Sequence, residues 1–300
     1  MRPVVKSTHT TIKGKHMNSK GLIAIVTGAS SGIGAATAEH LARAGYKVYG
    51  TSRRGAQGQG GKRTFQMLAL DVNSDESVLA TVNEVLRLEG RIDLLVNNAG
   101  FGLAPAAAEE SSIEQAQAIF NTNFFGVVRM TRAVVPHMRK RGSGRIINIS
   151  SVLGFVPMPY MALYSATKHA MEGYSESLDH ELRTQGVRVS LVQPAYIKSA
   201  FDANLLQPDA ALDEYRDLRA GLALRVKEAV EGADGPGVVA ETVVQVALAA
   251  KPKVRYTSGA LAGRLRLLRR FAPAALVEAG VRKDLRLDSQ PAQRKSATAL

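Results

Sequence analysis

A glycine-rich turn between an apolar strand and a helix constrains the fold of this 300-residue chain more than any other stretch. Residues 22–26 are short, apolar and rich in β-branched side chains, which is typical of a strand buried on both faces of a parallel sheet. Residues 27–34, with the sequence TGASSGIG, follow, and a helical pattern then continues to Ala44. Glycines permit a tight turn, and the first amides of the helix can face a pyrophosphate. The stretch therefore predicts an α/β fold that binds a nucleotide phosphate at this turn.

Strand and helix patterns alternate along the rest of the chain. Further strands are predicted at 46–51, 65–70, 92–96, 145–151, 187–192 and 254–256. Helices are predicted at 74–89, 111–140 and 239–250, with another that contains Tyr164 and ends near Gln185. We expect Pro136 to bend or finish the helix 111–140. The alternation predicts a Rossmann-type, doubly wound parallel sheet of about seven strands in a single α/β domain.

Composition excludes several classes of function. The chain has no cysteine, so it has no disulfide, no thiolate nucleophile and no Cys-ligated metal. Histidines do not cluster, and we predict no metal site. No apolar run approaches eighteen residues, and the polar N-terminus lacks the apolar region of a secretory signal. We therefore expect a cytoplasmic protein.

The net charge of +13 is concentrated at the two ends of the chain. Residues 1–20 carry five Lys/Arg and no Asp/Glu, and residues 251–300 carry twelve Lys/Arg and three Asp/Glu, which leaves the segment between them nearly neutral. A basic face for nucleic acid is therefore not expected in the core fold. We predict a disordered basic extension over 1–20, a catalytic domain over 21–258 and a basic, helical C-terminal extension and tail over 259–300.

Leucine and arginine alternate at helical spacing in residues 260–271, which indicates a basic amphipathic helix. We favour docking of its leucines on the domain or on a second subunit. Peripheral contact with a membrane surface is the alternative. Residues 196–235 carry apolar side chains among mixed charges, with an amphipathic helical pattern from residue 200 onward, and we interpret the segment as a lid over a substrate.

Tyr164 and Lys168 stand four residues apart, so they lie on one face of a helix. An ammonium beside a phenol lowers the phenol pKa from about 10 toward neutrality. Such a tyrosine can exchange a proton with an alcohol or a ketone near pH 7. Taken alone, the pair is better explained as part of an ordinary exposed helix face, so a catalytic role depends on the rest of the chain.

The second strand ends without a carboxylate. Rossmann units that bind NAD usually place an acidic residue there to hold the ribose 2′-hydroxyl. Here the strand is followed by Arg53 and Arg54, and a guanidinium suits a 2′-phosphate. We therefore favour NADP(H) over NAD(H), with Arg53 as the contact; solvated loop arginines are the alternative.

Five motifs in register resemble the short-chain dehydrogenase/reductase family over about residues 21–258. They are TGxxxGxG at 27–34, Asp71-Val72, NNAG at 97–100, the NxxG that begins at Asn123, and Ser151 thirteen residues before Tyr164. The NxxG spacing selects Asn123 over Asn121, and the thirteen-residue interval selects Ser151 over Ser150. From the residues alone, Asp71 could equally cap the turn before Ser74. Ala195 departs from the glycine that the family usually has there.

The resemblance implies a site for carbonyl and alcohol interconversion with a nicotinamide cofactor. The implied catalytic residues are Asn123, Ser151, Tyr164 and Lys168. The implied cofactor-binding residues are Gly28, Ser30, Ser31, Gly32, Ile33, Gly34, Arg53, Asp71, Val72, Asn97, Asn98, Ala99, Gly100, Tyr164, Lys168, Pro194, Ile197 and Ser199. In the family, Ser151 would orient the substrate oxygen, Tyr164 would exchange its proton, Lys168 would support the phenolate, and Asn123 would hold a water that refills the proton.

The resemblance also implies a small-molecule substrate, a hydrophobic ketone, aldehyde or alcohol, and a homodimer or homotetramer. The basic C-terminus is similar to that of 17β-hydroxysteroid and retinol dehydrogenase-like members. The alternative function is a non-catalytic NADP-binding redox sensor or scaffold, which would have no need of a proton relay.

Overall fold

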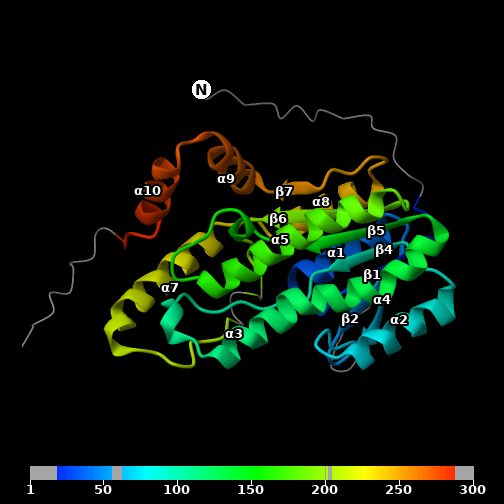
Figure 1. Cartoon of the computed structure of the whole chain (residues 1–300), viewed down its shortest axis with the longest axis horizontal. Helices are drawn as coiled ribbons and strands as arrows, with labels where there is room; N and C mark the ends of the chain where they lie inside the picture. Colours follow the sequence, from blue (N-terminus) through cyan, green and yellow to red (C-terminus); the bar gives the residue numbers. More distant parts are fainter. Residues whose placement is uncertain (1–18, 56–62, 200, 202–204, 288–300) are drawn as a thin grey trace, which may run out of the picture.

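Seven parallel strands form one sheet in the order β3-β2-β1-β4-β5-β6-β7 (Figure 1). The computed structural model describes residues 19–55, 63–199, 201 and 205–287. Residues 1–18 of the extension predicted over 1–20, and residues 288–300 of the C-terminal tail, lie outside these residues. The strands are β1 (Ile23–Val26), β2 (Lys47–Ser52), β3 (Gln66–Ala69), β4 (Leu94–Asn97), β5 (Gly144–Ile149), β6 (Val187–Pro194) and β7 (Arg255–Ser258). The structure confirms the fold class and the sheet of seven strands that the sequence predicts.

Helices connect the strands and continue beyond the last one. The α-helices are α1 (Gly32–Arg43), α2 (Asp75–Glu89), α3 (Ile113–Phe120), α4 (Gly126–Arg141), α5 (Ala162–Arg183), α7 (Arg216–Glu231), α8 (Gly237–Leu248), α9 (Ala260–Phe271) and α10 (Ala274–Asp284). A π-helical turn, η2 (Asn121–Phe125), joins α3 to α4, and short 3-10 helices are η1 (Ala108–Glu110), η3 (Val152–Gly154) and η4 (Asp213–Tyr215).

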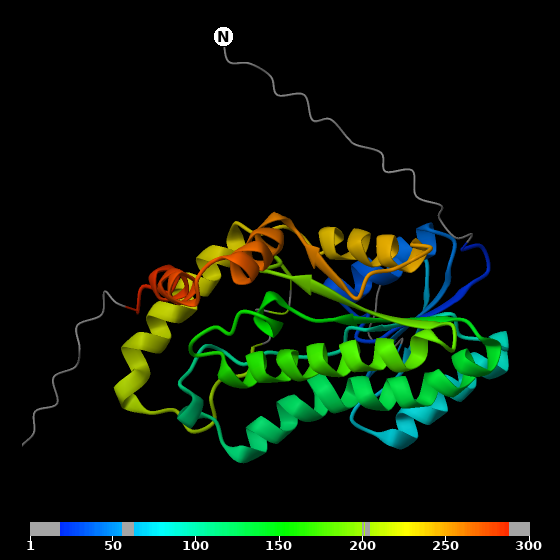
Figure 2. The same cartoon turned by 45° about the horizontal axis from the view of Figure 1, so that its top comes forward.

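Helices cover both faces of the sheet (Figure 2), and two apolar cores pack them onto it. One core joins Ile25 and Leu95 of the sheet to α2, α4 and α5. The other joins Val26 and Val96, the next residues along the same strands, to α1 and α8. Because neighbouring side chains of a strand point to opposite faces, both must be apolar when both faces are covered. This requirement explains the uninterrupted apolar runs in the sequence.

The strand order reverses between β1 and β4. From β1 the chain builds outward through β2 and β3, then returns to place β4 on the other side of β1. Connections leave these two strands in opposite directions, which opens a crevice beyond their carboxyl ends. The glycine-rich turn after β1 and residues 98–100 after β4 lie at that crevice.

The helix predicted over 111–140 is three segments. Ser112 caps α3 by accepting a hydrogen bond from the Gln115 amide, and the π-turn η2 then interrupts the α-helical hydrogen bonds before α4 begins. The expectation that Pro136 bends or finishes the helix is wrong about the end, because α4 continues to Arg141. Val134 and Met138, both fully buried, hold the last turns of α4 against the sheet despite the missing proline N–H.

Within the segment predicted as a helix from residue 200 onward, the described residues 205–212 are not helical. Leu206 forms an isolated parallel bridge with Leu103, and α7 begins only at Arg216. The C-terminal extension contains α9, as predicted over 260–271, and a second helix, α10. In the described part of the chain, no helix combines the length and apolar character needed to cross a bilayer.

Candidate active site

A cavity of about 1520 Å³ runs along the carboxyl edge of the sheet, from the glycine-rich turn to α7, α9 and α10. All four predicted catalytic residues line it, as does every predicted cofactor-binding residue except Asn97. Asn97 is buried at the end of β4, where its Nδ2 donates to Asn148 Oδ1 at 2.8 Å. In the structure, the Asn97 side chain therefore links β4 to β5.

The glycine-rich turn is held against the segment after β4. Thr27 Oγ1 accepts hydrogen bonds from the amides of Asn98 at 2.9 Å and Ala99 at 3.0 Å. In return, Asn98 Nδ2 donates to the carbonyls of Thr27 and Gly28. Gly28 has a φ of +67°, and a Cβ there would lie 2.9 Å from Ala99 Cα. These contacts hold one side of the turn against the segment after β4, and the other side of the turn lines the cavity.

Gly34 allows the first turn of α1 to lie directly on this loop. A Cβ at Gly34 would lie 2.3 Å from the Gly28 carbonyl oxygen and 2.5 Å from Asn98 Nδ2, so no other residue fits without rearrangement. Ser30, Ser31, Gly32 and Ile33 then line the cavity at the amino end of α1. A helix N-terminus with small residues above it fits a pyrophosphate, so the residues present suit the dinucleotide that the sequence predicts.

Two arginines lie near this end of the cavity. Arg53 is exposed and lines the cavity just beyond β2. Arg63, which the sequence did not single out, donates to the carbonyls of Ala29 and Ser30, both at 3.1 Å, and its guanidinium lies 5.1 Å from the centre of the Phe65 ring. No motif marks Arg63; only the parallel pairing of β2 with β3 brings it beside the turn.

Lys168 is buried beneath Tyr164 on α5. Its Nζ donates to the Ile149 carbonyl at 2.9 Å and lies 5.6 Å from the centre of the Tyr164 ring. Burial lowers the pKa of the Lys168 ammonium to about 8, while the nearby Glu172 carboxylate acts in the opposite direction. The Tyr164 ring also contacts Phe201, with ring centres 6.0 Å apart. The spacing of four residues on α5 therefore places the phenol and the ammonium at one point of the cavity.

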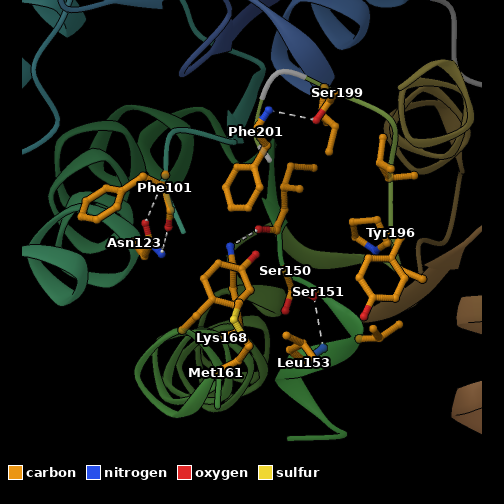
Figure 3. Close-up of a pocket in the computed structure, with 18 of the residues that line it drawn as sticks. Phe101, Asn123, Ser150, Ser151, Leu153, Met161, Lys168, Tyr196, Ser199 and Phe201 are labelled. Atoms are coloured by element: carbon orange, nitrogen blue, oxygen red, sulfur yellow. Dashed lines mark hydrogen bonds between the residues drawn. The ribbon is translucent and has the colours of Figure 1, made fainter. Parts of the chain in front are cut away.

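Ser151 follows β5 and caps η3, with its Oγ accepting a hydrogen bond from the Leu153 amide at 3.1 Å (Figure 3). Ser150 also lines the cavity, and its buried Oγ has no hydrogen-bond partner among the described residues. The structure thus brings both serines to the cavity, and the family interval remains the reason for choosing Ser151.

Asn123 is fixed inside the π-turn. Its side chain forms two hydrogen bonds with the backbone of Phe101, accepting from the amide at 3.0 Å and donating to the carbonyl at 2.8 Å (Figure 3). Its Nδ2 also lies 3.4 Å from Thr167 Oγ1 on α5. Asn123 therefore joins three elements around the cavity: the segment after β4, the π-turn and α5. The water that the resemblance assigns to Asn123 stays a prediction.

Other predicted cofactor residues frame the same cavity. Asp71 Oδ1 accepts from the Asn73 amide at 2.9 Å, whereas Ser74 caps α2 with its own side chain. Ser199, beyond β6, lies over the glycine-rich turn, with its Cβ 3.6 Å from the position that a Gly32 Cβ would take. The remaining predicted cofactor-binding residues that line the cavity are Val72, Gly100, Pro194 and Ile197.

A model of the family described as "short chain dehydrogenase" matches residues 22–210, which is more than half of the chain. The chain belongs to the short-chain dehydrogenase family. A 3-ketodihydrosphingosine reductase of Bacteroides thetaiotaomicron is 46% identical over 182 residues, 61% of this chain and 66% of that protein, just under two thirds of its length. Retinol dehydrogenase 8 of Bos taurus is 36% identical over 253 residues, which cover 77% of this chain and 79% of the relative. These relatives are oxidoreductases, and so is this short-chain dehydrogenase.

Solved structures share the fold of this dehydrogenase. A short-chain dehydrogenase from Streptomyces avermitilis is 30% identical with a TM-score of 0.71, over 90% of this chain and 98% of that one. A metagenomic short-chain oxidoreductase in complex with NADP is 29% identical with a TM-score of 0.62, over 81% and 100% of the two chains. A family member from Burkholderia phymatum in complex with NAD is 26% identical with a TM-score of 0.70, over 92% and 98%. A nicotinamide cofactor is therefore supported, with both forms present among similar structures.

The cavity of this dehydrogenase becomes largely apolar beyond Tyr164, although Arg225, Arg264 and Asp284 also line this part. Its walls there come from the segment after β5, from the segment predicted as a lid and from the C-terminal helices. The apolar lining residues in this part are Leu153, Val156, Met158, Met161, Phe201, Leu205, Val226, Leu261, Leu265, Leu268, Leu276, Val277, Val281 and Leu285. The site therefore joins a polar end, built from motifs of the family, to a long apolar end.

Proposed function

We propose that this dehydrogenase interconverts a ketone or aldehyde and the corresponding alcohol, on a hydrophobic substrate, with NADP(H). The observation that carries the proposal is the position of Tyr164, Lys168 and Ser151. They line the cavity between the glycine-rich turn, which suits a dinucleotide, and the apolar walls, which suit a hydrophobic substrate. When bound, the nicotinamide cofactor supplies or accepts the hydride.

Side chains of the site would transfer the proton that the reaction adds to or removes from the substrate oxygen. Ser151 would hydrogen-bond the substrate oxygen and orient it. Tyr164 would donate its phenolic proton to that oxygen in reduction and accept it in oxidation. The Lys168 ammonium, anchored on the Ile149 carbonyl, favours the phenolate by charge. Asn123, joined to Phe101 and close to Thr167, would hold the surrounding elements in position.

Tyr164→Phe removes only the phenol oxygen and tests this assignment. We expect NADPH oxidation with a panel of hydrophobic ketones and aldehydes to fall by a factor of about 10³ or more, because the proton donor is lost, while NADPH binding stays unchanged. Turnover near the wild-type rate would refute the assignment. A wild-type protein that binds NADPH but reduces none of the carbonyls would instead support a redox sensor.

The choice of NADP(H) depends on Arg53, which lines the cavity beyond a strand that ends without a carboxylate. Arg53→Ala should weaken NADPH binding by about tenfold or more while NADH binding changes little, because only NADPH carries the 2′-phosphate. Dissociation constants follow from the fluorescence of the reduced nicotinamide. Arg54→Ala, an exposed neighbour outside the cavity lining, is the matched control. Equal loss for both cofactors in Arg53→Ala would contradict the proposal.

A lipid-like substrate is the best fit to the apolar end of the cavity. The two relatives described above are named for 3-ketodihydrosphingosine and for retinol, both of which join a reactive carbonyl or alcohol to a long apolar part. We therefore propose a substrate of this class. Assembly as a homodimer or homotetramer and location in the cytoplasm stay predictions.

A further inference from the structure

The C-terminal helices expose an unusual run of large apolar side chains. Leu267 is 61% exposed, Leu268 54%, Phe271 72% and Leu276 65%. Phe271 follows Leu268 by three positions and Leu267 by four, so the three side chains lie on one side of α9. Large apolar side chains exposed in this number often mark a surface that meets a partner. We call the exposed side chains of this region, Leu261, Arg264, Leu267, Leu268, Arg269, Arg270, Phe271 and Leu276, together the C-terminal face.

Positive charge accompanies these apolar side chains. Arg264, Arg269 and Arg270 are exposed, and no ion pair involves any of them among the residues that the structure describes. Residues 260–284 hold six Lys/Arg and two Asp/Glu, and one of those acids, Asp284, pairs with Arg225 on α7 at 2.5 Å. The C-terminal face therefore combines leucines with a surplus of guanidinium groups, a combination that suits an acidic, amphiphilic partner.

The cavity opens at the same face. Leu261, Leu268 and Leu276 are each more than 40% exposed and also line the cavity that contains Tyr164. Arg264 lies among them in the lining. Figure 2 shows α9 and α10 beside α7 at one end of the molecule, away from α2 and the β3 edge of the sheet. The apolar end of the cavity is therefore reached through the exposed leucines.

We propose that the C-terminal face docks on the surface of an anionic lipid bilayer. The leucines and Phe271 would enter the boundary between headgroups and acyl chains, and the arginines would lie against lipid phosphates. Contact at the surface agrees with the absence, among described residues, of a helix able to span a bilayer. A lipid-like substrate could then move from the bilayer into the cavity; this last step rests on the proposed function, whereas the docking does not.

A second copy of this chain fits the face less well. A two-fold interface brings the same patch of both copies together, so Arg264, Arg269 and Arg270 of both copies would gather at one interface. Like charges without acidic partners repel each other at such an interface. An anionic bilayer instead offers apolar depth for Phe271 and negative charge for the arginines at one surface.

The experiment is flotation of the full chain with two kinds of vesicle, phosphatidylcholine alone and phosphatidylcholine with about one third phosphatidylserine. We expect the wild type to bind the anionic vesicles and not the neutral ones. Leu267→Gln/Phe271→Gln and Arg269→Gln/Arg270→Gln should each reduce binding by about tenfold or more. The matched control is Arg139→Gln/Lys140→Gln, which removes two exposed charges at the end of α4 and should bind within about twofold of the wild type.

Binding is measured without turnover, so it is independent of the proposed reaction, and thermal unfolding shows whether each variant is folded. Wild-type binding by both α9 variants would overturn the proposal and assign binding to another basic segment. An equal loss in the α4 control would also overturn it, because net charge alone would then explain binding. Absence of vesicle binding together with a smaller sedimentation coefficient for Leu267→Gln/Phe271→Gln would overturn it in favour of an interface between copies or with another protein.

Discussion

Lys168 is a buried cation, and the loss of its hydration on folding makes its contribution to the stability of the protein depend on pH. Its folded pKa of about 8 is below the ordinary value of 10.5, because burial disfavours the charged form. Below pH 8 the lysine is protonated in both the folded and the unfolded chain. Between pH 8 and 10.5 the unfolded chain binds more protons, so the contribution of Lys168 to the free energy of unfolding rises with pH.

Lys168→Met removes this contribution, and Tyr164→Phe is a suitable background because it removes the neighbouring phenol from the titration. We compare urea unfolding of Tyr164→Phe with that of Tyr164→Phe/Lys168→Met from pH 7 to pH 10, without cofactor. Between pH 7 and pH 10, the free energy of unfolding of the lysine-containing protein should rise by about 2–3 kcal/mol relative to that of the methionine variant. Parallel pH profiles would show that Lys168 keeps an ordinary pKa.

At the scale of elements, one hydroxyl accepts two of the hydrogen bonds that join the end of β1 to the segment after β4. Thr27 Oγ1 accepts from two amides, those of Asn98 and Ala99, and Thr27 is almost fully buried. Thr27→Val keeps the shape of the side chain but leaves both amides without this acceptor. We expect a loss of about 2–4 kcal/mol in the free energy of unfolding by urea, together with weaker cofactor binding at the adjacent turn.

Thr37→Val is the control for this change. Thr37 on α1 is also fully buried, but its Oγ1 has no hydrogen-bond partner among the described residues. The same substitution there should be neutral or slightly stabilising, because no bond is lost and a buried hydroxyl is removed. A similar loss at both threonines would mean that shape, and not the two amide bonds, explains the Thr27 effect.

Among the described residues, the buried carboxylate of Glu110 joins the segment predicted as a lid to the rest of the domain. Glu110 accepts hydrogen bonds from the amides of Ala107 at 2.8 Å and Leu212 at 2.9 Å, and from the guanidinium of Arg219 on α7. Glu110→Gln would place an amide NH₂ where an acceptor is needed and would take the charged partner away from Arg219, which keeps its hydrogen bond to the Leu212 carbonyl. We expect faster hydrogen exchange in residues 205–222 and a KM for carbonyl substrates raised by about tenfold or more, with NADPH affinity unchanged.

Asp209→Asn provides the comparison for the lid. Asp209 also joins the lid to α3, accepting from the Ser112 amide at 2.8 Å and from its hydroxyl at 2.6 Å, but its carboxylate is exposed. Water can replace an exposed acceptor, so a smaller effect is expected. Equal effects of the two substitutions would contradict the view that burial makes Glu110 the principal anchor.

For the whole molecule, the sequence predicted those features that depend on local pattern. Buried parallel strands such as 23–26 need continuous apolar runs, and the turn after β1 needs glycine where a Cβ would meet the backbone, so both are visible in the residues. The bonds of Asn123 and of Arg63 join segments far apart in the chain, and no spacing encodes them. Because no local pattern marks these bonds, the sequence predicts one continuous helix over 111–140, whereas the π-turn interrupts it in the structure.

The sequence also did not predict the apolar part of the cavity that extends from Tyr164 to the C-terminal helices. This part forms only where α7, α9 and α10 line the same cavity. If a long substrate lies along this part of the cavity, filling its wall should penalise long chains alone. Ala229 on α7 lines the cavity, whereas Ala223 on the same helix is exposed and lies outside it. Ala229→Trp should raise the KM for long-chain ketones by about tenfold or more and leave short-chain ketones nearly unchanged, because a short chain ends before the indole. Ala223→Trp should change neither. An equal effect of Ala229→Trp on short and long substrates would place the substrate elsewhere in the cavity.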